Sequence, residues 1–335
     1  MDQGRITSTR SLLTIAVLGL ALGAAAMPTA AQTPATSDNT SEPAVDHNAW
    51  SSGRPMPLAV KYPMARGVNN NIYVVGGITA TEVVANNQVY DPVANTWRTG
   101  APIPTTTFDA AVTVVKNVLY IFGGSEDGKT VTNAVWAYNP TTNKWSPKKA
   151  MLTARDSAAA AVKNNIVYVI GGNSSIGGGR LTTVESYDPA TDIWTEEAPL
   201  LVGKSEPSVG LVGTTIVAAG GFTANGDDGN NEGYNASSNS WTSLAREPVG
   251  RNDSCTGSIG GQLYTAGGSN SQSVAVNNTE SFNPTKNKWS TLASMPQSVA
   301  GAGSAVYKGM LYCFGGGNFG DIQGNVFNYV RIYQP

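Results

Sequence analysis

One interval recurs along this 335-residue chain: six times, a tryptophan stands 26 residues before a pair of glycines. A repeat that is 47 to 49 residues long stacks copies of one supersecondary unit, because a single unit cannot bury its apolar face alone. Function must therefore come from the positions where the copies differ. The repeated residues are Trp50 with Gly76 and Gly77, Trp97 with Gly123 and Gly124, Trp145 with Gly171 and Gly172, Trp194 with Gly220 and Gly221, Trp241 with Gly267 and Gly268, and Trp289 with Gly315 and Gly316.

The interval from each glycine pair to the next tryptophan varies between 21 and 23 residues. An aromatic residue locates this variation, because it always stands seven residues before the tryptophan. The variable stretch therefore lies between the glycine pair and the aromatic residue, and we predict a loop there, since loops absorb length changes. These aromatic residues are Tyr90, Tyr138, Tyr187, Tyr234 and Phe282.

Each unit contains the signals of four strands. Apolar runs such as residues 72–75 end at the glycine pair and are rich in β-branched and aromatic residues, as buried strands are. Small-residue runs such as 158–162 come before them, separated by turn pairs such as Asn69-Asn70 that favour hairpins. A five-residue alanine run is too short for a helix that stands alone. Small residues on the first strand and large aromatics on the last two predict sheets that converge on an axis.

The glycine pair that closes an apolar strand, followed by Tyr and then Trp, resembles the kelch repeat from Asp46 to Pro335. The resemblance implies an all-β, six-bladed β-propeller with four antiparallel strands per blade. The chain ends just after the sixth aromatic phrase, at residues 330–335, whereas Trp50 has no strands before it. We therefore predict that the N-terminal strand completes the last blade. The expected repeats are 51–97, 98–145, 146–194, 195–241, 242–289, and 290–335 with 46–50.

The pattern of the N-terminal residues predicts that the protein is exported from the cytoplasm. Arg5 and Arg10 precede the apolar run 12–26, and small residues at 29–31 suit cleavage after Ala31, as in a secretory signal peptide. We therefore expect residues 1–31 to be removed and the protein to be secreted or periplasmic; a retained N-terminal anchor is the alternative. Residues 32–45, rich in Thr, Ser, Pro and Ala, are predicted to be a disordered linker.

Two cysteines fall in neighbouring units, Cys255 in the first strand of the fifth and Cys313 in the second strand of the sixth. An exported protein can join such a pair in a disulfide. Two buried free thiols in apolar strands are the interpretation we favour.

Composition excludes several classes of function. The net charge is −2 and only 13% of residues are charged, which disfavours nucleic acid and anionic membranes as partners. The single histidine, His47, lies in the peripheral closing strand, so a Ser-His-Asp triad or a histidine-ligated metal site is not expected. That also excludes the copper site of galactose oxidase-like kelch propellers, which needs two histidines. Residues 225–232 carry oxygen ligands but lack the EF-hand order, and we predict a solvated loop. We expect no cofactor, no metal and a monomer.

The connections that join strands two to three and four to one should emerge on one face, because strand direction alternates within a blade. The variable connections are 125–129, 174–180, 227–228, 270–272 and 318–321, and the others place polar residues beside the axis. These expected ligand-binding residues are Lys61, Tyr62, Asp109, Arg155, Asp156, Lys204, Glu206, Arg251 and Asp253. They form either local salt bridges or a ligand site, which kelch-like propellers commonly place here. Since Arg suits carboxylates, we hypothesise that Arg155, Lys204 and Arg251 line an anion-preferring mouth.

Three functions remain. We favour a non-catalytic, extracytoplasmic binding module that recognises a protein, peptide or glycan on the loop-rich face. The alternative is an enzyme resembling the periplasmic six-bladed kelch sialic-acid mutarotases, which would use Glu206, Arg251 and Asp253 on a sugar acid. The short loops count against it, because none is long enough to form a lid that excludes water. The third is a structural role in the cell envelope, since fold alone does not decide function.

Overall fold

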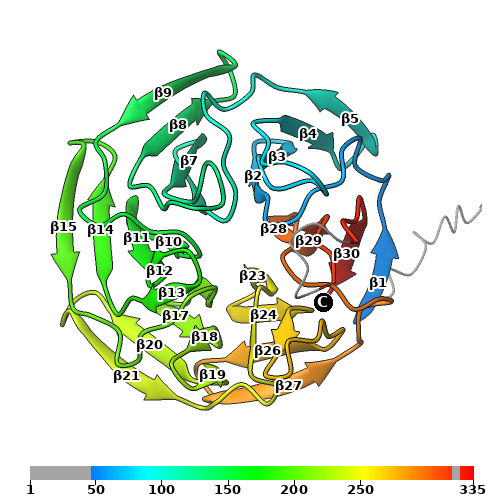
Figure 1. Cartoon of the computed structure of the whole chain (residues 1–335). Coiled ribbons are helices and arrows are strands. Elements are labelled where there is room, and N and C mark those ends of the chain that lie inside the picture. Colours follow the sequence, from blue (N-terminus) through cyan, green and yellow to red (C-terminus); the bar gives the residue numbers. More distant parts are fainter. Residues whose placement is uncertain (1–46, 319–324) are drawn as a thin grey trace, which may run out of the picture. The chain divides into compact units, whose positions relative to one another are not determined.

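Six four-stranded antiparallel sheets stand around a common axis, as the blades of a propeller (Figure 1). The computed structural model describes residues 47–318 and 325–335, and Val45–Pro335 form one compact unit. The predicted signal peptide and linker, residues 1–45, lie outside the described residues, as does part of the predicted connection 318–321. The predicted fold class and the resemblance to the kelch repeat are confirmed. Within the described ranges, no helix has the length and apolar character needed to cross a membrane.

Each of the first five blades consists of four strands in chain order, and the first strand of each lies beside the axis (Figure 1). Their bounds are β2 (Met64–Val68), β3 (Asn71–Val75), β4 (Asn87–Asp91) and β5 (Thr96–Thr99) in blade 1; β6 (Ala111–Val115), β7 (Val118–Phe122), β8 (Val135–Asn139) and β9 (Lys144–Lys148) in blade 2; β10 (Ala159–Lys163), β11 (Ile166–Ile170), β14 (Val184–Asp188) and β15 (Ile193–Glu197) in blade 3; β16 (Ser208–Val212), β17 (Thr215–Ala219), β20 (Asn231–Asn235) and β21 (Ser240–Leu244) in blade 4; and β23 (Cys255–Ile259), β24 (Gln262–Ala266), β26 (Thr279–Asn283) and β27 (Lys288–Leu292) in blade 5.

The sixth blade contains both ends of the propeller. It is built from β28 (Gly303–Tyr307), β29 (Met310–Phe314) and β30 (Val330–Gln334), with β1 (Ala49–Ser52) as the outer strand. Trp50 pairs with Tyr333 across the strands, and its Nε1 donates to the carbonyl oxygen of Ala293 at 2.8 Å. His47 Nδ1 lies 2.7 Å from the carbonyl oxygen of Pro335. The predicted closure by the N-terminal strand is confirmed.

The hydrophobic core is divided into six clusters, each shared by two neighbouring blades. The glycine pairs let the blades approach this closely. Gly76 has a φ of +61°, and a Cβ there would lie 2.2 Å from the carbonyl oxygen of Thr107 in the connection to blade 2. Gly77 N donates to that same oxygen at 2.8 Å. The repeated glycines thus serve backbone conformation and contact between blades.

Three short pairings add to the blades. β12 (Asn173–Ser175) pairs with β13 (Gly178–Arg180), and β18 (Phe222–Thr223) pairs with β19 (Gly226–Asp227). β22 (Arg251–Asn252) pairs with β25 (Ser269–Asn270). The second pairing occupies part of the segment 225–232, which we expected to be a solvated loop. The last residue of this segment, Glu232, belongs to β20 rather than to the loop. Its side chain is buried and forms an ion pair with Lys204.

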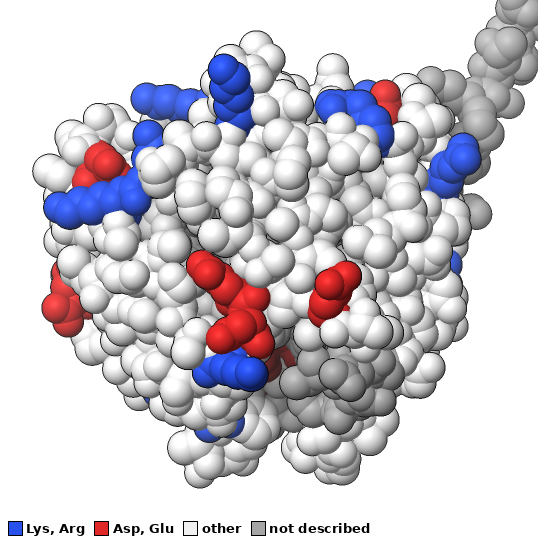
Figure 2. Space-filling view, turned by 45° about the horizontal axis from the view of Figure 1, so that its top comes forward, with Lys and Arg blue, Asp and Glu red and all other residues white. Residues whose placement is uncertain are grey.

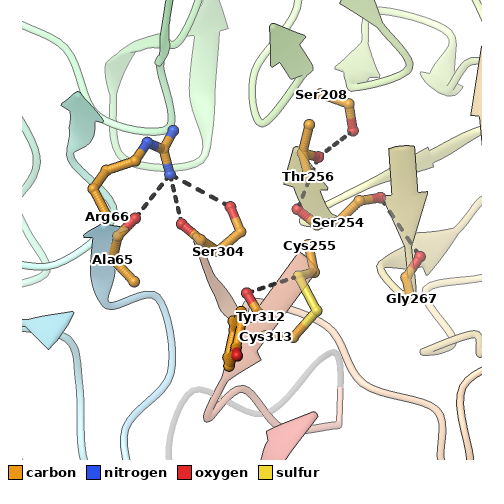
Figure 3. The surroundings of a disulfide bond; sticks show 10 residues. All are labelled: Ala65, Arg66, Ser208, Ser254, Cys255, Thr256, Gly267, Ser304, Tyr312 and Cys313. Carbon is orange, nitrogen blue, oxygen red and sulfur yellow. Dashed lines mark hydrogen bonds between the residues drawn. A yellow bond between two sulfur atoms is a disulfide. The ribbon is translucent and has the colours of Figure 1, made fainter. Parts of the chain in front are cut away.

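A disulfide links Cys255 of β23 to Cys313 of β29, so it joins blades 5 and 6 (Figure 3). The favoured interpretation of two free thiols is therefore wrong. The inner strand of blade 5 packs against the second strand of blade 6, and this brings the two Cα atoms to 5.7 Å, within the range that a disulfide spans. The two cysteines are separated by 58 positions in the sequence, and this spacing did not reveal their proximity.

Candidate functional site

The two sets of connections meet on one face of the propeller, as predicted. In every blade, a residue that leads into the first strand forms an antiparallel bridge with a residue just after the glycine pair. The bridged pairs are Lys61 with Ile78, Phe108 with Ser125, Asp156 with Asn173, Ser205 with Phe222, Asn252 with Ser269, and Ala300 with Gly317. The bridges fix the loops that surround the axis and give this face a defined shape.

A ring of six residues, one from each blade, encircles the axis on this face. All six have left-handed backbone, with φ between 51° and 65°. Five backbone hydrogen bonds of 2.7 to 3.1 Å run around the ring from one blade to the next, for example from Ser157 N to Asp109 O at 2.8 Å. The six residues are Tyr62, Asp109, Ser157, Glu206, Asp253 and Gly301. The shared backbone conformation therefore presents one residue per blade to the axis, and five of the six carry a side chain.

The ring surrounds an open cavity of about 120 Å³, which we call the acidic mouth. Its floor is formed by the next residue of each blade, which is Pro63, Ala110, Ala158, Pro207, Ser254 or Ala302. Three carboxylic acids, Asp109, Glu206 and Asp253, line the mouth, and none of its twelve lining residues is a lysine or an arginine. The polar groups available to a bound molecule are thus acidic and hydroxyl groups.

Burial is the main influence on the acids of the mouth. It raises the pKa of Asp109 to about 6, although Ser157 Oγ donates to Asp109 Oδ2 at 2.5 Å and opposes the shift. Burial, reinforced by the charges of Asp253 and Asp109, raises the pKa of Glu206 well above its ordinary value. Asp156 lies next to the ring, and its pKa rises to about 7 through burial and the Asp109 charge. Asp109 and Asp156 therefore exchange protons with solvent near neutral pH.

Tyr62 contributes the mouth's aromatic group. Burial and the charges of the three acids raise the pKa of its phenol, so the hydroxyl keeps its proton at neutral pH and acts as a donor. The ring of Tyr62 lies directly over Gly301, where an added Cβ would come within 2.6 Å of Tyr62 Cε1. The glycine of blade 6 therefore makes room for the tyrosine of blade 1.

The predicted anion-preferring mouth is wrong, because the three cations lie inside the blades. Arg155 pairs with Glu185, Lys204 Nζ lies 3.0 Å from Glu232 Oε1, and all four side chains are fully buried. Arg251 Nε lies 3.2 Å from Glu247 Oε1, and the same guanidinium also pairs with Glu280. For these three cations the alternative interpretation, local salt bridges, is therefore the one that the structure shows. Lys61 Nζ likewise turns from the axis and donates to Asn318 O at 2.7 Å.

The structure thus divides the predicted site residues into two groups. Tyr62, Asp109, Glu206 and Asp253 line the mouth, joined by Ser157 and Gly301, which the sequence analysis missed. The other predicted residues, which do not line it, are Lys61, Arg155, Asp156, Lys204 and Arg251. A signal for the ion pairs was present in the repeat. Glutamates stand two residues before the aromatic in blades 3, 4 and 5, the blades whose cations they pair with: Glu185, Glu232 and Glu280.

Comparison with known proteins agrees with this geometry. A family model of the KLHDC2/KLHL20/DRC7 Kelch-repeats domain matches residues 39–221, more than half of the chain. The chain belongs to the kelch-repeat family. A second model, the Kelch motif, matches residues 250–296 of this kelch propeller. No curated protein matches the chain. Among solved structures, that of YjhT is similar with a TM-score of 0.71 and 19% sequence identity, covering 84% of this chain and 96% of that chain. At this identity the similarity concerns the fold alone.

Proposed function

We propose that this kelch propeller is an extracytoplasmic binding module whose acidic mouth takes a positively charged group of a protein or peptide, namely a lysine, an arginine or an amino terminus. The observation that carries the proposal is the convergence of Asp109, Glu206 and Asp253 on one cavity with no cation among its lining residues. A carboxylate beside an ammonium or guanidinium forms a charge-assisted hydrogen bond, which is stronger than one between neutral groups.

The charge state of the mouth supports a cation as its occupant. Burial raises the pKa values of Asp109 and Glu206, and the charges of Asp253 and Asp109 raise that of Glu206 further, so ionisation of these acids is unfavourable in the empty mouth. An incoming cation reverses this balance, because an opposite charge within about 4–6 Å favours the ionised acid. Binding would therefore release protons, and Tyr62 would offer a hydroxyl donor beside them.

The size of the mouth favours a side chain over a glycan. An apolar cavity of ~150 Å³ holds one benzene molecule, so a mouth of about 120 Å³ accommodates the end of a side chain better than a substituted sugar ring. The surrounding loops also carry exposed apolar residues, Ile176 at 37% and Val274 at 55% exposure, which suit contact with a polypeptide. On the side shown in Figure 2, acidic and basic groups are scattered over a mostly uncharged surface. A surface of this kind disfavours a highly charged polymer as the binding partner.

The geometry favours this module over the mutarotase-like alternative. A sugar acid brings a carboxylate, which needs a cation or several hydrogen-bond donors. The acidic mouth supplies no cation from its lining residues, and Arg251, proposed above as a catalytic residue, is enclosed between Glu247 and Glu280.

Location outside the cytoplasm is part of the proposal. The predicted signal peptide motivates it, and the Cys255–Cys313 disulfide supports it, because such bonds persist in oxidising compartments. Expression in a bacterial host followed by fractionation would test it: we expect periplasmic or secreted protein that begins at Gln32. A full-length product in the cytosolic fraction would contradict the expectation.

Selection of random dodecapeptides on the immobilised protein tests the proposed function. We expect the recovered peptides to be enriched in Lys or Arg, and one such peptide to bind the Asp109→Asn/Asp253→Asn double variant at least tenfold more weakly, because about 1.4 kcal/mol of lost attraction is tenfold in affinity. Glu126→Gln, at an exposed position of a 2–3 connection, is the matched control and should bind as wild type. Recovery of peptides without a cationic residue, or equal binding by the double variant, would refute the proposal.

A further inference from the structure

A second cavity lies deeper along the axis, within the inner strands. It measures about 240 Å³ and is lined by residues of β2, β6, β10, β16, β23 and β28. Arg66 of β2 lines it, four residues along the chain from Tyr62 of the acidic mouth. Since a strand rises ~3.3 Å per residue, the two levels are roughly 13 Å apart. We call this space the channel cavity.

Arg66 is the one charged residue among those that line the channel cavity. Most of the other lining residues are aliphatic or glycine, and Thr113, Thr256 and Ser258 add hydroxyl groups. At the level of Arg66, every other blade contributes a short residue or none beyond the backbone. These residues are Thr113, Ala161, Gly210, Gly257 and Ala305. A single long cation therefore extends into a space that five blades leave open.

The guanidinium of Arg66 is only partly satisfied by the protein (Figure 3). Its Nη1 donates to the carbonyl oxygens of Ala65 at 2.9 Å and Ser304 at 2.7 Å. Within the described part of the chain, Nε and Nη2 have no hydrogen-bond acceptor and no carboxylate lies within ion-pair distance. Burial lowers the pKa of Arg66 to about 10, so the group stays charged at neutral pH. Arg155 and Arg251 differ in this respect, because each is paired with glutamate.

A hydroxyl group in the same cavity also lacks a partner. Ser258 Oγ is buried and makes no hydrogen bond to any described residue. It lies over the inner strand of blade 4, where a Cβ on Gly210 would come within 2.1 Å of it. Buried polar groups in native proteins are nearly always hydrogen-bonded. The open Nε–Nη2 edge of Arg66 and the unpaired hydroxyl of Ser258 therefore both belong to residues that line this cavity.

We propose that the channel cavity binds a short-chain carboxylate. The Nε–Nη2 edge of Arg66 is the side-on edge of the guanidinium, and it matches the two oxygens of a planar carboxylate in a bidentate pair. The aliphatic lining, which includes Val114, Val162 and Leu211, suits a hydrocarbon chain of a few carbons. The site is separate from the acidic mouth in level and opposite to it in charge.

Isothermal titration calorimetry with butyrate tests the inference on the full chain, at constant ionic strength and with butyramide as the uncharged analogue. We expect saturable binding of butyrate by the wild type and none of butyramide. Arg66→Met should lose at least tenfold in affinity. Arg66→Lys keeps the charge but lacks the side-on pair of donors, so it should bind severalfold more weakly than wild type.

Two further variants keep the test decisive if Arg66→Met fails to fold. Thr113→Leu fills the cavity from blade 2 while it keeps Arg66, and it should abolish butyrate binding. Arg98→Met removes an exposed guanidinium from the outer strand β5 and should bind as wild type. Absence of saturable butyrate binding by the wild type would overturn the proposal, as would binding that Thr113→Leu leaves unchanged. Sulfate binding more tightly than butyrate would overturn the assignment to carboxylates.

Discussion

At the scale of single residues, the acids of the mouth stand in an environment that opposes their charge. Asp109 accepts a hydrogen bond from the hydroxyl of Ser157, and burial moves its pKa from an ordinary value of 3.8 to about 6. A nearby cation would oppose this rise in the pKa. The cations of the neighbouring connections, Arg155, Lys204 and Arg251, lie elsewhere, in ion pairs within the blades. The acids of the mouth therefore lower the stability of the folded protein. Functional sites often carry a cost of this kind.

Asp109→Asn should stabilise the protein at alkaline pH. Below pH 3.8 the aspartate is protonated in both the folded and the unfolded chain and its ionisation contributes nothing. Between pH 3.8 and about 6 the folded state holds a proton that the unfolded state has lost, so stability falls as pH rises through this window. Above it the penalty is complete. We expect the variant to melt above wild type at pH 8 and no higher at pH 4, by calorimetry. A lower melting temperature than wild type at pH 8 would show that the Asp109 charge is stabilised.

The residue scale also shows why the sequence located the site but mistook its sign. Adjacent residues of an extended segment point to opposite sides, so residues two apart point to the same side. In a regular strand Arg251 and Asp253 would therefore face the same way. The left-handed residues of the ring break that alternation: Asp253 faces the axis and Arg251 the sheet. The sequence showed that Arg251 and Asp253 lie two positions apart in the same connection. It did not show which of the two side chains faces the axis.

At the scale of elements, one buried ion pair in each of blades 3, 4 and 5 ties the segment before the first strand to the third strand of the same blade. In blade 4, Lys204 reaches Glu232 of β20, and the other carboxylate oxygen of Glu232 accepts from Leu201 N at 2.7 Å. Arg155 and Glu185 repeat the arrangement in blade 3, with Leu152 N as the donor. These pairs hold the connections in place and thereby position the ring. The repeat was enough to predict the strands and their order. The partners in these ion pairs could not be predicted in the same way, because they depend on which way each side chain points across the sheet.

Glu232→Gln should destabilise the protein because it leaves a charged Lys204 buried without its counter-ion. Breaking such a pair costs about 3–5 kcal/mol in typical cases, and urea denaturation would measure the loss in the free energy of unfolding. Asp228→Asn is the control, since it breaks the partly exposed pair with Arg246 and should cost under about 1 kcal/mol. Equal effects of the two substitutions would contradict the role assigned to the buried pair.

At the scale of the whole molecule, the ring is closed by hydrogen bonding between the two ends of the propeller. β1 adds the missing outer strand to blade 6, and the indole of Trp50 reaches back to blade 5. The other five repeat tryptophans donate in the same way to the preceding blade, as Trp97 does to Arg54 O at 2.9 Å. The repeat count and the unpaired Trp50 were enough to predict this closure. The disulfide between blades 5 and 6 was not predictable, because spacing in sequence does not report distance between strands.

Trp50→Ala should loosen the ring where its ends meet. Loss of a partly buried indole and its hydrogen bond should cost about 2–4 kcal/mol, near the lower end for large-to-small core substitutions, and should lower the melting temperature. Val274→Ala, at an exposed position of a variable connection, is the control and should change it little. A melting temperature of Trp50→Ala equal to that of wild type would contradict the closure.

The pH dependence of binding tests the acidic mouth most directly. A lysine-bearing peptide from the selection, acetylated at its amino terminus and free of histidine, keeps its ammonium charge between pH 5 and 8, so a change in affinity reports the protein. Because Asp109 has a pKa of about 6 and ionised acids attract the cation, affinity should rise at least tenfold from pH 5 to pH 8. The rise should be smaller in Asp109→Asn. Affinity that is constant across this range, or that falls as pH rises, would contradict the account.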